Sequence, residues 1–163
     1  MSARIYPLSA PERAKHLATH IVKLQYTDLI GLTGASTAAT AVAAVLFAAK
    51  AGTRVEYLGH RLVTPFANGA DAAFNTNTSK VGDGTDDDRF GLSQELNLNG
   101  TYVPVGPVSA PATTQPYLYG ADTNVLATIG SMTGKKISDL TQGEVHYLFR
   151  LTNLKKVSDS VPG

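Results

Sequence analysis

The chain has 163 residues, of which 17% are charged, and its formal net charge is +1. A chain of this length most naturally forms one domain with a buried core. The absence of cysteine excludes a disulfide framework, a zinc-thiolate site and a thiol nucleophile. The near-neutral charge argues against nucleic-acid binding through phosphate contacts.

No segment has the length of a membrane span, because the longest apolar run, residues 41–49, is much shorter than the roughly 20 residues required. The N-terminus lacks the continuous apolar region of a secretory signal. The sequence therefore predicts a soluble protein that is made in a cytoplasm and does not bind membranes.

Residues 1–17 are predicted to form an extended arm outside the core. Pro7 and Pro11 interrupt regular strand pairing, and the apolar side chains are too few to form a face. These apolar residues are Ile5, Tyr6 and Leu8. Two interpretations stay open: a mobile terminus, or an arm that becomes ordered on a neighbouring subunit.

Residues 37–49 are ambiguous, because their alanines favour a helix but no polar face is present. We predict a buried strand with Val42, Ala44 and Leu46 on one side and Val45 and Phe47 on the other.

Residues 53–60 are predicted to form the next strand, paired with residues 37–49 as a hairpin through residues 49–52. Val55 and Tyr57 alternate with polar residues, which places Arg54, Glu56 and His60 on the opposite face.

Further along, Asn99-Gly100 lies between two alternating runs, which predicts a two-residue hairpin over residues 96–105. Residues 104–116 contain four prolines and are expected to form an extended loop. Strands are also predicted at residues 20–25, 78–81, 123–129 and 144–151. About eight short antiparallel strands without an amphipathic helix predict an all-β, single-domain β-sandwich or jelly roll.

The acidic stretch at residues 78–90 has the highest local concentration of charge. It contains four aspartates, two glycines, one arginine and a phenylalanine: Asp83, Asp86, Asp87, Asp88, Gly82, Gly84, Arg89 and Phe90. A calcium loop of the EF-hand type would need glycine at its sixth position and glutamate at its twelfth, where Asp88 and Gln94 stand. The favoured interpretation is a solvated structural corner in which Arg89 pairs with a carboxylate and Phe90 returns to the core; a surface calcium site stays open.

No catalytic constellation is evident. The segment at residues 130–135 is one residue too short for a phosphate-binding loop, and no serine lies in a nucleophile-elbow motif. The four histidines lack metal-ligand spacing, although convergence of His20, His60 and His146 in the fold stays open. We expect a protein that is not an enzyme and needs no cofactor.

The order of several segments resembles capsid cement or decoration proteins of tailed bacteriophages, which have a jelly-roll core. These segments are K-A-G-T-R-V, R-L-V-T-P-F, S-K-V-G-D followed by D-D-D-R-F, Y-G-A-D-T-N-V, and I-S-D-L-T-Q-G-E-V-H-Y-L-F-R-L. The resemblance covers residues 18–154. It leaves residues 1–17 as an N-terminal arm, and residues 155–163 form a polar C-terminal tail.

The resemblance implies a virion protein that binds the major capsid protein on the outer surface of a phage head, commonly as a trimer, and braces neighbouring capsomers. Exposed aromatic, aliphatic and arginine side chains are common interface anchors. On that basis the expected contacts are Ile5, Tyr6, Leu8, Arg13, Tyr117 and Tyr119.

Two alternatives remain at this point. One is another virion role, in head completion, the tail or the baseplate. The other is a carbohydrate-binding β-sandwich that uses Tyr102, Tyr117 or Tyr119 as a stacking platform and the aspartate cluster for calcium.

Overall fold

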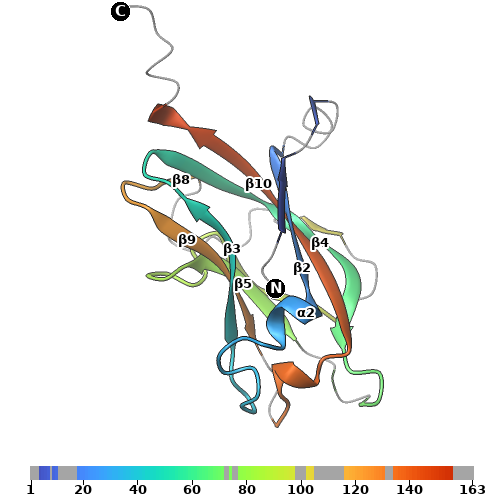
Figure 1. The fold of residues 1–163 in the computed structure, drawn as a ribbon. Coiled ribbons are helices and arrows are strands. Elements are labelled where there is room, and N and C mark those ends of the chain that lie inside the picture. Colours follow the sequence, from blue (N-terminus) through green and yellow to red (C-terminus); the bar gives the residue numbers. More distant parts are fainter. Residues whose placement is uncertain are drawn as a thin grey trace, which may run out of the picture.

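The computed structural model describes residues 4–7, 9–10, 18–71, 74, 77–97, 102–104, 116–130 and 134–155. These residues form two antiparallel sheets that pack face to face, which confirms the prediction of an all-β sandwich (Figure 1). Among them, no helix is long and apolar enough to cross a membrane.

The first sheet has the order β1-β2-β10-β4-β7, with the short strand β8 also paired to β4. Its strands are β1 (Arg4–Pro7), β2 (His20–Gln25), β10 (Gln142–Asn153), β4 (Thr53–Ala67), β7 (Tyr102–Pro104) and β8 (Tyr117–Leu118). The second sheet has the order β3-β9-β5-β6. Its strands are β3 (Val42–Ala49), β9 (Thr123–Gly130), β5 (Thr78–Asp83) and β6 (Gly91–Glu95). Two short helices, α2 (Tyr26–Leu29) and η1 (Ile137–Asp139), precede β3 and β10.

The strand connections are those of a jelly roll. When β1 and β8 are set aside and the other eight strands are numbered along the chain, the two sheets have the orders 1-8-3-6 and 2-7-4-5. Almost every connection therefore passes from one sheet to the other, as in two interlocked Greek keys. The predicted jelly roll of about eight antiparallel strands is confirmed.

This connectivity makes two predicted hairpins wrong. β3 and β4 are consecutive in the chain, but β3 pairs with β9 and β4 pairs with β10. Likewise, β6 pairs with β5 and β7 pairs with β4, so the strands flanking Asn99-Gly100 belong to different sheets. The Asn99-Gly100 turn itself lies outside the described residues. A local turn motif favours a reversal of the chain but does not select the strand that becomes the partner.

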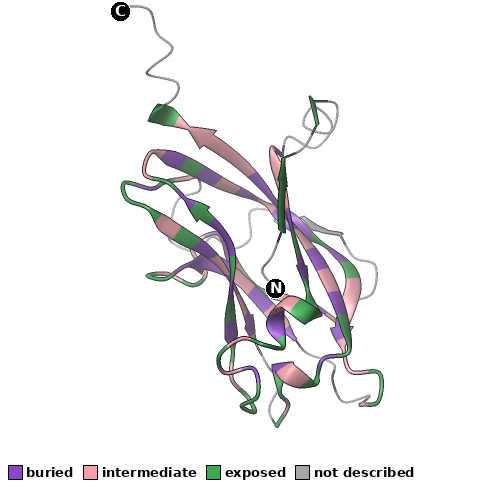
Figure 2. Ribbon diagram, in the orientation of Figure 1, coloured by how far each residue is buried: buried purple, intermediate pink, exposed green. Residues whose placement is uncertain are grey.

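β3 is a strand, as predicted, and its alternation changes at a bulge. Val42, Ala44 and Leu46 are buried, whereas Val45 is exposed (Figure 2). The prediction placed Phe47 on the same side as Val45. A register shift against β9 between Val45 and Phe47 turns Phe47 to the buried side instead.

A second bulge corrects the prediction for His60. Phe149 pairs with Tyr57 but Leu148 pairs with Gly59, so Leu58 is an additional residue in β4. The alternation shifts by one position, and His60 becomes buried on the core side instead of lying on the polar face.

β10 confirms the predicted alternation most clearly. Val145, Tyr147 and Phe149 are fully buried, and Leu151 is half-buried against the core. The rings of Phe47 and Phe149 meet edge to face with centroids 5.0 Å apart, which joins the two sheets at the centre of the core.

The N-terminal arm is partly incorporated into the first sheet, which the prediction did not foresee. Arg4–Pro7 pair antiparallel with β2, in a register that aligns Ile5 with Val22 and Pro7 with His20. Pro7 is tolerated because it is the last residue of an edge strand. Leu8 and residues 11–17 lie outside the described part of the chain, as do residues 156–163 of the predicted tail.

Candidate functional site

The acidic corner is organised around the buried carboxylate of Asp83, at the end of β5. Its Oδ1 accepts hydrogen bonds from the Thr85 amide at 2.9 Å, the Thr85 hydroxyl at 2.7 Å and the Asp86 amide at 3.1 Å. Its Oδ2 accepts hydrogen bonds from Arg89 Nε at 2.5 Å and from the Tyr119 hydroxyl at 2.9 Å. The carboxylate thus links the residues of the turn to one another and to Tyr119, which follows β8 of the other sheet.

These bonds determine the ionisation of Asp83. Burial by itself would raise the pKa of this carboxyl, but the hydrogen bonds from Thr85, Arg89 and Tyr119 outweigh burial and lower the pKa to about 2. Burial, together with the neighbouring Asp83, raises the pKa of the Tyr119 hydroxyl above its ordinary value. Asp83 is therefore ionised at neutral pH, and it is the hydrogen-bond acceptor at the centre of the cluster.

The backbone of the corner has space only for glycine at one position. A Cβ on Gly82 would lie 2.1 Å from the Asp86 carbonyl oxygen, so the turn closes directly over residue 82. The chain then returns at Phe90, whose amide donates to the Val81 carbonyl at 2.9 Å and whose side chain is fully buried. The interpretation of this stretch as a structural corner is supported, including the ion pair between Arg89 and a carboxylate.

Tyr117 and Tyr119 join this corner, although they were expected to be exposed contacts. The guanidinium carbon of Arg89 lies 4.2 Å from the centroid of the Tyr117 ring, and the two tyrosine rings meet edge to face at 4.9 Å. Tyr117 is half-buried, whereas Tyr119 is only 5% exposed. The expectation of an exposed contact is therefore wrong for Tyr119, because its hydroxyl is bonded to Asp83.

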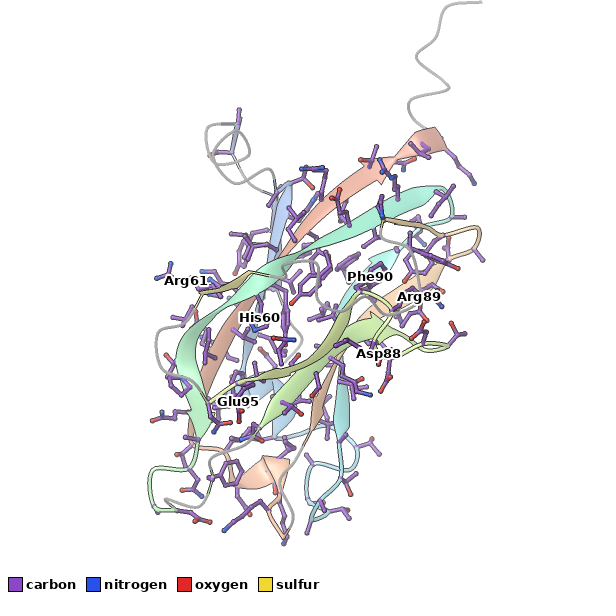
Figure 3. All side chains as sticks on the ribbon, turned by 180° about the vertical axis from the view of Figure 1, so that it is seen from behind. His60, Arg61, Asp88, Arg89, Phe90 and Glu95 are labelled. Carbon is purple, nitrogen blue, oxygen red and sulfur yellow. The ribbon has the colours of Figure 1, made fainter. Side chains whose placement is uncertain are left out.

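Three further carboxylates lie on the solvent side of the corner, and one of them, Asp88, is labelled in Figure 3. Oxygen atoms of Asp86, Asp87 and Asp88 lie within 4.8 Å of one another, so these are the residues that could hold a hard cation. Lys80 Nζ lies 3.1 Å from Asp87 and 3.9 Å from Asp88. Burial and then the adjacent carboxylate of Asp86 raise the pKa of Asp88. The lysine therefore already supplies positive charge to this cluster.

The other candidate surface is the edge strand β1, which contains two of the predicted contacts. Ile5 is 39% exposed and Tyr6 is 41% exposed. Lys23 Nζ on β2 lies 5.5 Å from the centroid of the Tyr6 ring. A polar groove of about 230 Å³ runs beside this ring, lined by Arg4, Tyr6, Lys23, Gln25, Asp28 and Glu144. Leu8 and Arg13, the remaining predicted contacts, lie outside the described residues.

The three histidines that the structure describes, His20, His60 and His146, are not brought together into a catalytic or metal site. His60 points into the core, as Figure 3 shows, and bonds the Tyr57 hydroxyl through Nδ1 at 2.8 Å. His60 pairs with Tyr147, so the neighbouring His146 points to the other face of the sheet. There its Nε2 lies 2.6 Å from a carboxylate oxygen of Glu144. His20 bonds Thr19 at 2.8 Å, near the start of β2.

The sequence analysis did not predict the polar bonds inside the sandwich. Tyr147 on β10 bonds Ser79 on β5 across the core at 2.7 Å, in addition to the bond between Tyr57 and His60. Tyr57 and Tyr147 lie at inward positions of alternating strands, which is a sequence feature that could have suggested a buried partner for each hydroxyl; His60 lies inward only because of the bulge at Leu58.

His60 makes the stability of the fold depend on pH. Burial lowers the pKa of this imidazole from 6.5 to about 4, so the unfolded chain takes up a proton at a higher pH than the folded chain. We expect the free energy of unfolding to be highest above pH 6.5, where His60 is neutral in both states. It should fall by about 3 kcal/mol as the pH decreases toward 4. Chemical unfolding at a series of pH values should show this slope, and a His60→Gln variant should lack it. An equal slope in both proteins between these pH values would contradict the prediction.

Comparison with models of protein families, with curated proteins and with solved structures found no match to this chain.

Proposed function

We propose that this chain is a non-enzymatic structural protein of a tailed-phage virion, which binds the major capsid protein on the outer surface of the head and braces neighbouring capsomers. Jelly rolls of eight strands occur in viral capsid domains and also in lectins. The fold is therefore compatible with a virion role but does not select it.

The exposed edge strand β1 is the observation that supports a contact role best. All four residues of Arg4–Pro7 are exposed, although they are part of a sheet. Tyr6 places an aromatic ring beside the cations Arg4 and Lys23, and Ile5 adds exposed aliphatic surface on the other face of the strand. This combination of an aromatic anchor with a polar rim is typical of protein interfaces.

Symmetric assembly would strengthen a contact of this modest size. In a trimer, three copies of β1 would face the head together, and binding of the first copy would make the second and third contacts intramolecular. The surface would then need only weak affinity for each subunit of the shell.

The carbohydrate-binding alternative is less well supported by the geometry of the tyrosines. Tyr119 is buried against Asp83, and Arg89 covers the ring of Tyr117. A sugar-stacking platform needs a free aromatic face, and Tyr119 is buried while Arg89 occupies one face of Tyr117. The side chain of Tyr102, the third tyrosine of this alternative, lies outside the described part of the structure.

Binding to heads of the phage that encodes the chain tests the proposal. Heads that lack the protein are mixed with the purified chain, sedimented and imaged by electron microscopy. We expect regular density on the outer surface and greater resistance of the heads to heat. Ile5→Thr with Tyr6→Ser should weaken binding at least about tenfold, since interface anchors contribute 1 kcal/mol or more each.

Val63→Thr is the matched control, because Val63 is a β-branched strand residue with the same 39% exposure as Ile5. It should bind heads as the unmodified protein does. Density elsewhere in the virion would place the protein in the head-completion, tail or baseplate class. Absence of binding to any virion component would overturn the proposal.

A further inference from the structure

We propose that β3 is an interface strand, which pairs antiparallel with β3 of a second copy about a two-fold axis. The two four-stranded sheets β3-β9-β5-β6 would then form one continuous sheet of eight strands. This pairing goes beyond the proposed binding to phage heads and is testable on the purified chain alone.

The inference starts from the five outermost strands among the described residues, which are β1, β7, β8, β3 and β6. An unpaired strand edge can bind the edge of another chain, and proteins protect such edges by short length, proline, charge or bulges. Four of these strands carry such protection, and β8 is protected because it has only two residues. β1 has four residues with an arginine and a proline, β7 has three residues with a proline, and β6 has five residues with a glutamate.

β3 is different, because it has eight residues, V-A-A-V-L-F-A-A, without a charge or a proline. Among the described strands it pairs only with β9, and its other edge is the end of the sheet. Its one protective feature is the bulge at Leu46, which leaves Val42 to Val45 in unbroken register with β9. This stretch is a regular template on which another strand can add, and the added strand would lie beside β1, the end strand of the other sheet, which approaches β3.

The side chains beside this edge are also suited to a neighbouring strand. Ala43, Val45 and Ala48 are exposed on the outer face, and Val45 is 45% exposed. In the register with β9, Val45 lies opposite Leu126 and Ala43 opposite Thr128. The outer face next to the edge is therefore small, apolar and uncharged, and a second sheet with the same face would extend it.

A second copy is the occupant that fits this edge. A partner strand must itself be long and free of proline and charge, and β3 is the one outermost strand in the described chain that meets these conditions. Pairing of β3 with β3 about a two-fold axis is self-complementary and closed, so it gives a dimer and not a fibre. On a phage head, such a contact would link copies that belong to different trimers.

Cross-linking tests the interface directly, because the chain has no cysteine. Ala43→Cys and Val45→Cys are prepared separately and treated with a short bismaleimide, with Val63→Cys as the control on an exposed position of β4. We expect covalent dimers from at least one of the β3 variants and none above background from the control. Equal yields from all three variants would overturn the proposal.

A charge variant gives an independent measurement. Val45→Lys adds a like charge on the outer face of each paired β3 strand, so we expect the dimer dissociation constant to rise by about tenfold or more in sedimentation experiments. Val63→Lys should leave this constant unchanged. The proposal is wrong if the unmodified chain shows no self-association through β3, or if Val45→Lys associates as strongly as Val63→Lys. Loss of head binding in Ile5→Thr with Tyr6→Ser is a separate outcome, because β1 lies in the other sheet.

Discussion

Asp83→Ala is expected to lower the free energy of unfolding by about 3–5 kcal/mol, because the mostly buried Arg89 loses its closest carboxylate and keeps the more distant Asp86, at 4.0 Å, as an ion-pair partner in the corner. The Arg89 side chain is 11% exposed. The Tyr119 hydroxyl and the Thr85 amide would also lose their acceptor. Urea unfolding followed by circular dichroism at pH 7 measures the change.

Asp87→Asn is the matched control in the same turn, because the Asp87 side chain is 52% exposed and forms its ion pair with Lys80 at the surface. We expect it to change stability by no more than about 0.5 kcal/mol and to leave head binding intact. A stability loss in Asp83→Ala as small as that of the control would show that Asp83 does not anchor the corner. Lost binding by a folded Asp87→Asn protein would instead restore a metal-binding role for the acidic cluster.

Phe90→Ala is expected to destabilise the domain by about 3–5 kcal/mol, since Phe90 is fully buried and truncation of its ring leaves a cavity. The ring also packs against Tyr119, with centroids 6.3 Å apart. The cavity would therefore open beside the bonded Asp83 cluster. Urea unfolding measures this variant too, and Phe90→Leu, which keeps most of the buried volume, should lose much less stability. A loss below about 1 kcal/mol in Phe90→Ala would mean that the corner collapses around the smaller side chain.

Both variants act on the same corner, and this corner differs from the surfaces proposed for binding. Asp83 and Phe90 are buried, whereas Ile5 and Tyr6 on β1 are exposed in a strand of the other sheet. Stability and head binding should therefore be separable by mutation. The charged residues of the turn then serve to stabilise the fold, with the ionised Asp83 at their centre.

The sequence predicted those features that depend on local alternation. Val145, Tyr147 and Phe149 of β10 are buried, as their spacing indicated, because successive side chains of a strand point to opposite faces. The absence of a polar face at residues 37–49 also predicted a buried strand in place of a helix; β3 confirms a strand, at Val42–Ala49, but only one of its faces is buried. In the acidic stretch, the glycines and the apolar Phe90 were sufficient to predict a corner.

Only the tertiary structure determined which strands pair and which residues meet. Strand alternation repeats with a period of two, so one additional residue, such as Leu58 in β4, reverses the faces that follow and places His60 in the core. The turn motifs did not specify that most connections cross between the sheets. Asp83 and Tyr119 are 36 positions apart in the chain, and no local pattern links them. They meet because the jelly roll brings the end of β5 and the residue after β8 to the same end of the sandwich, where burial requires each polar group to find a partner.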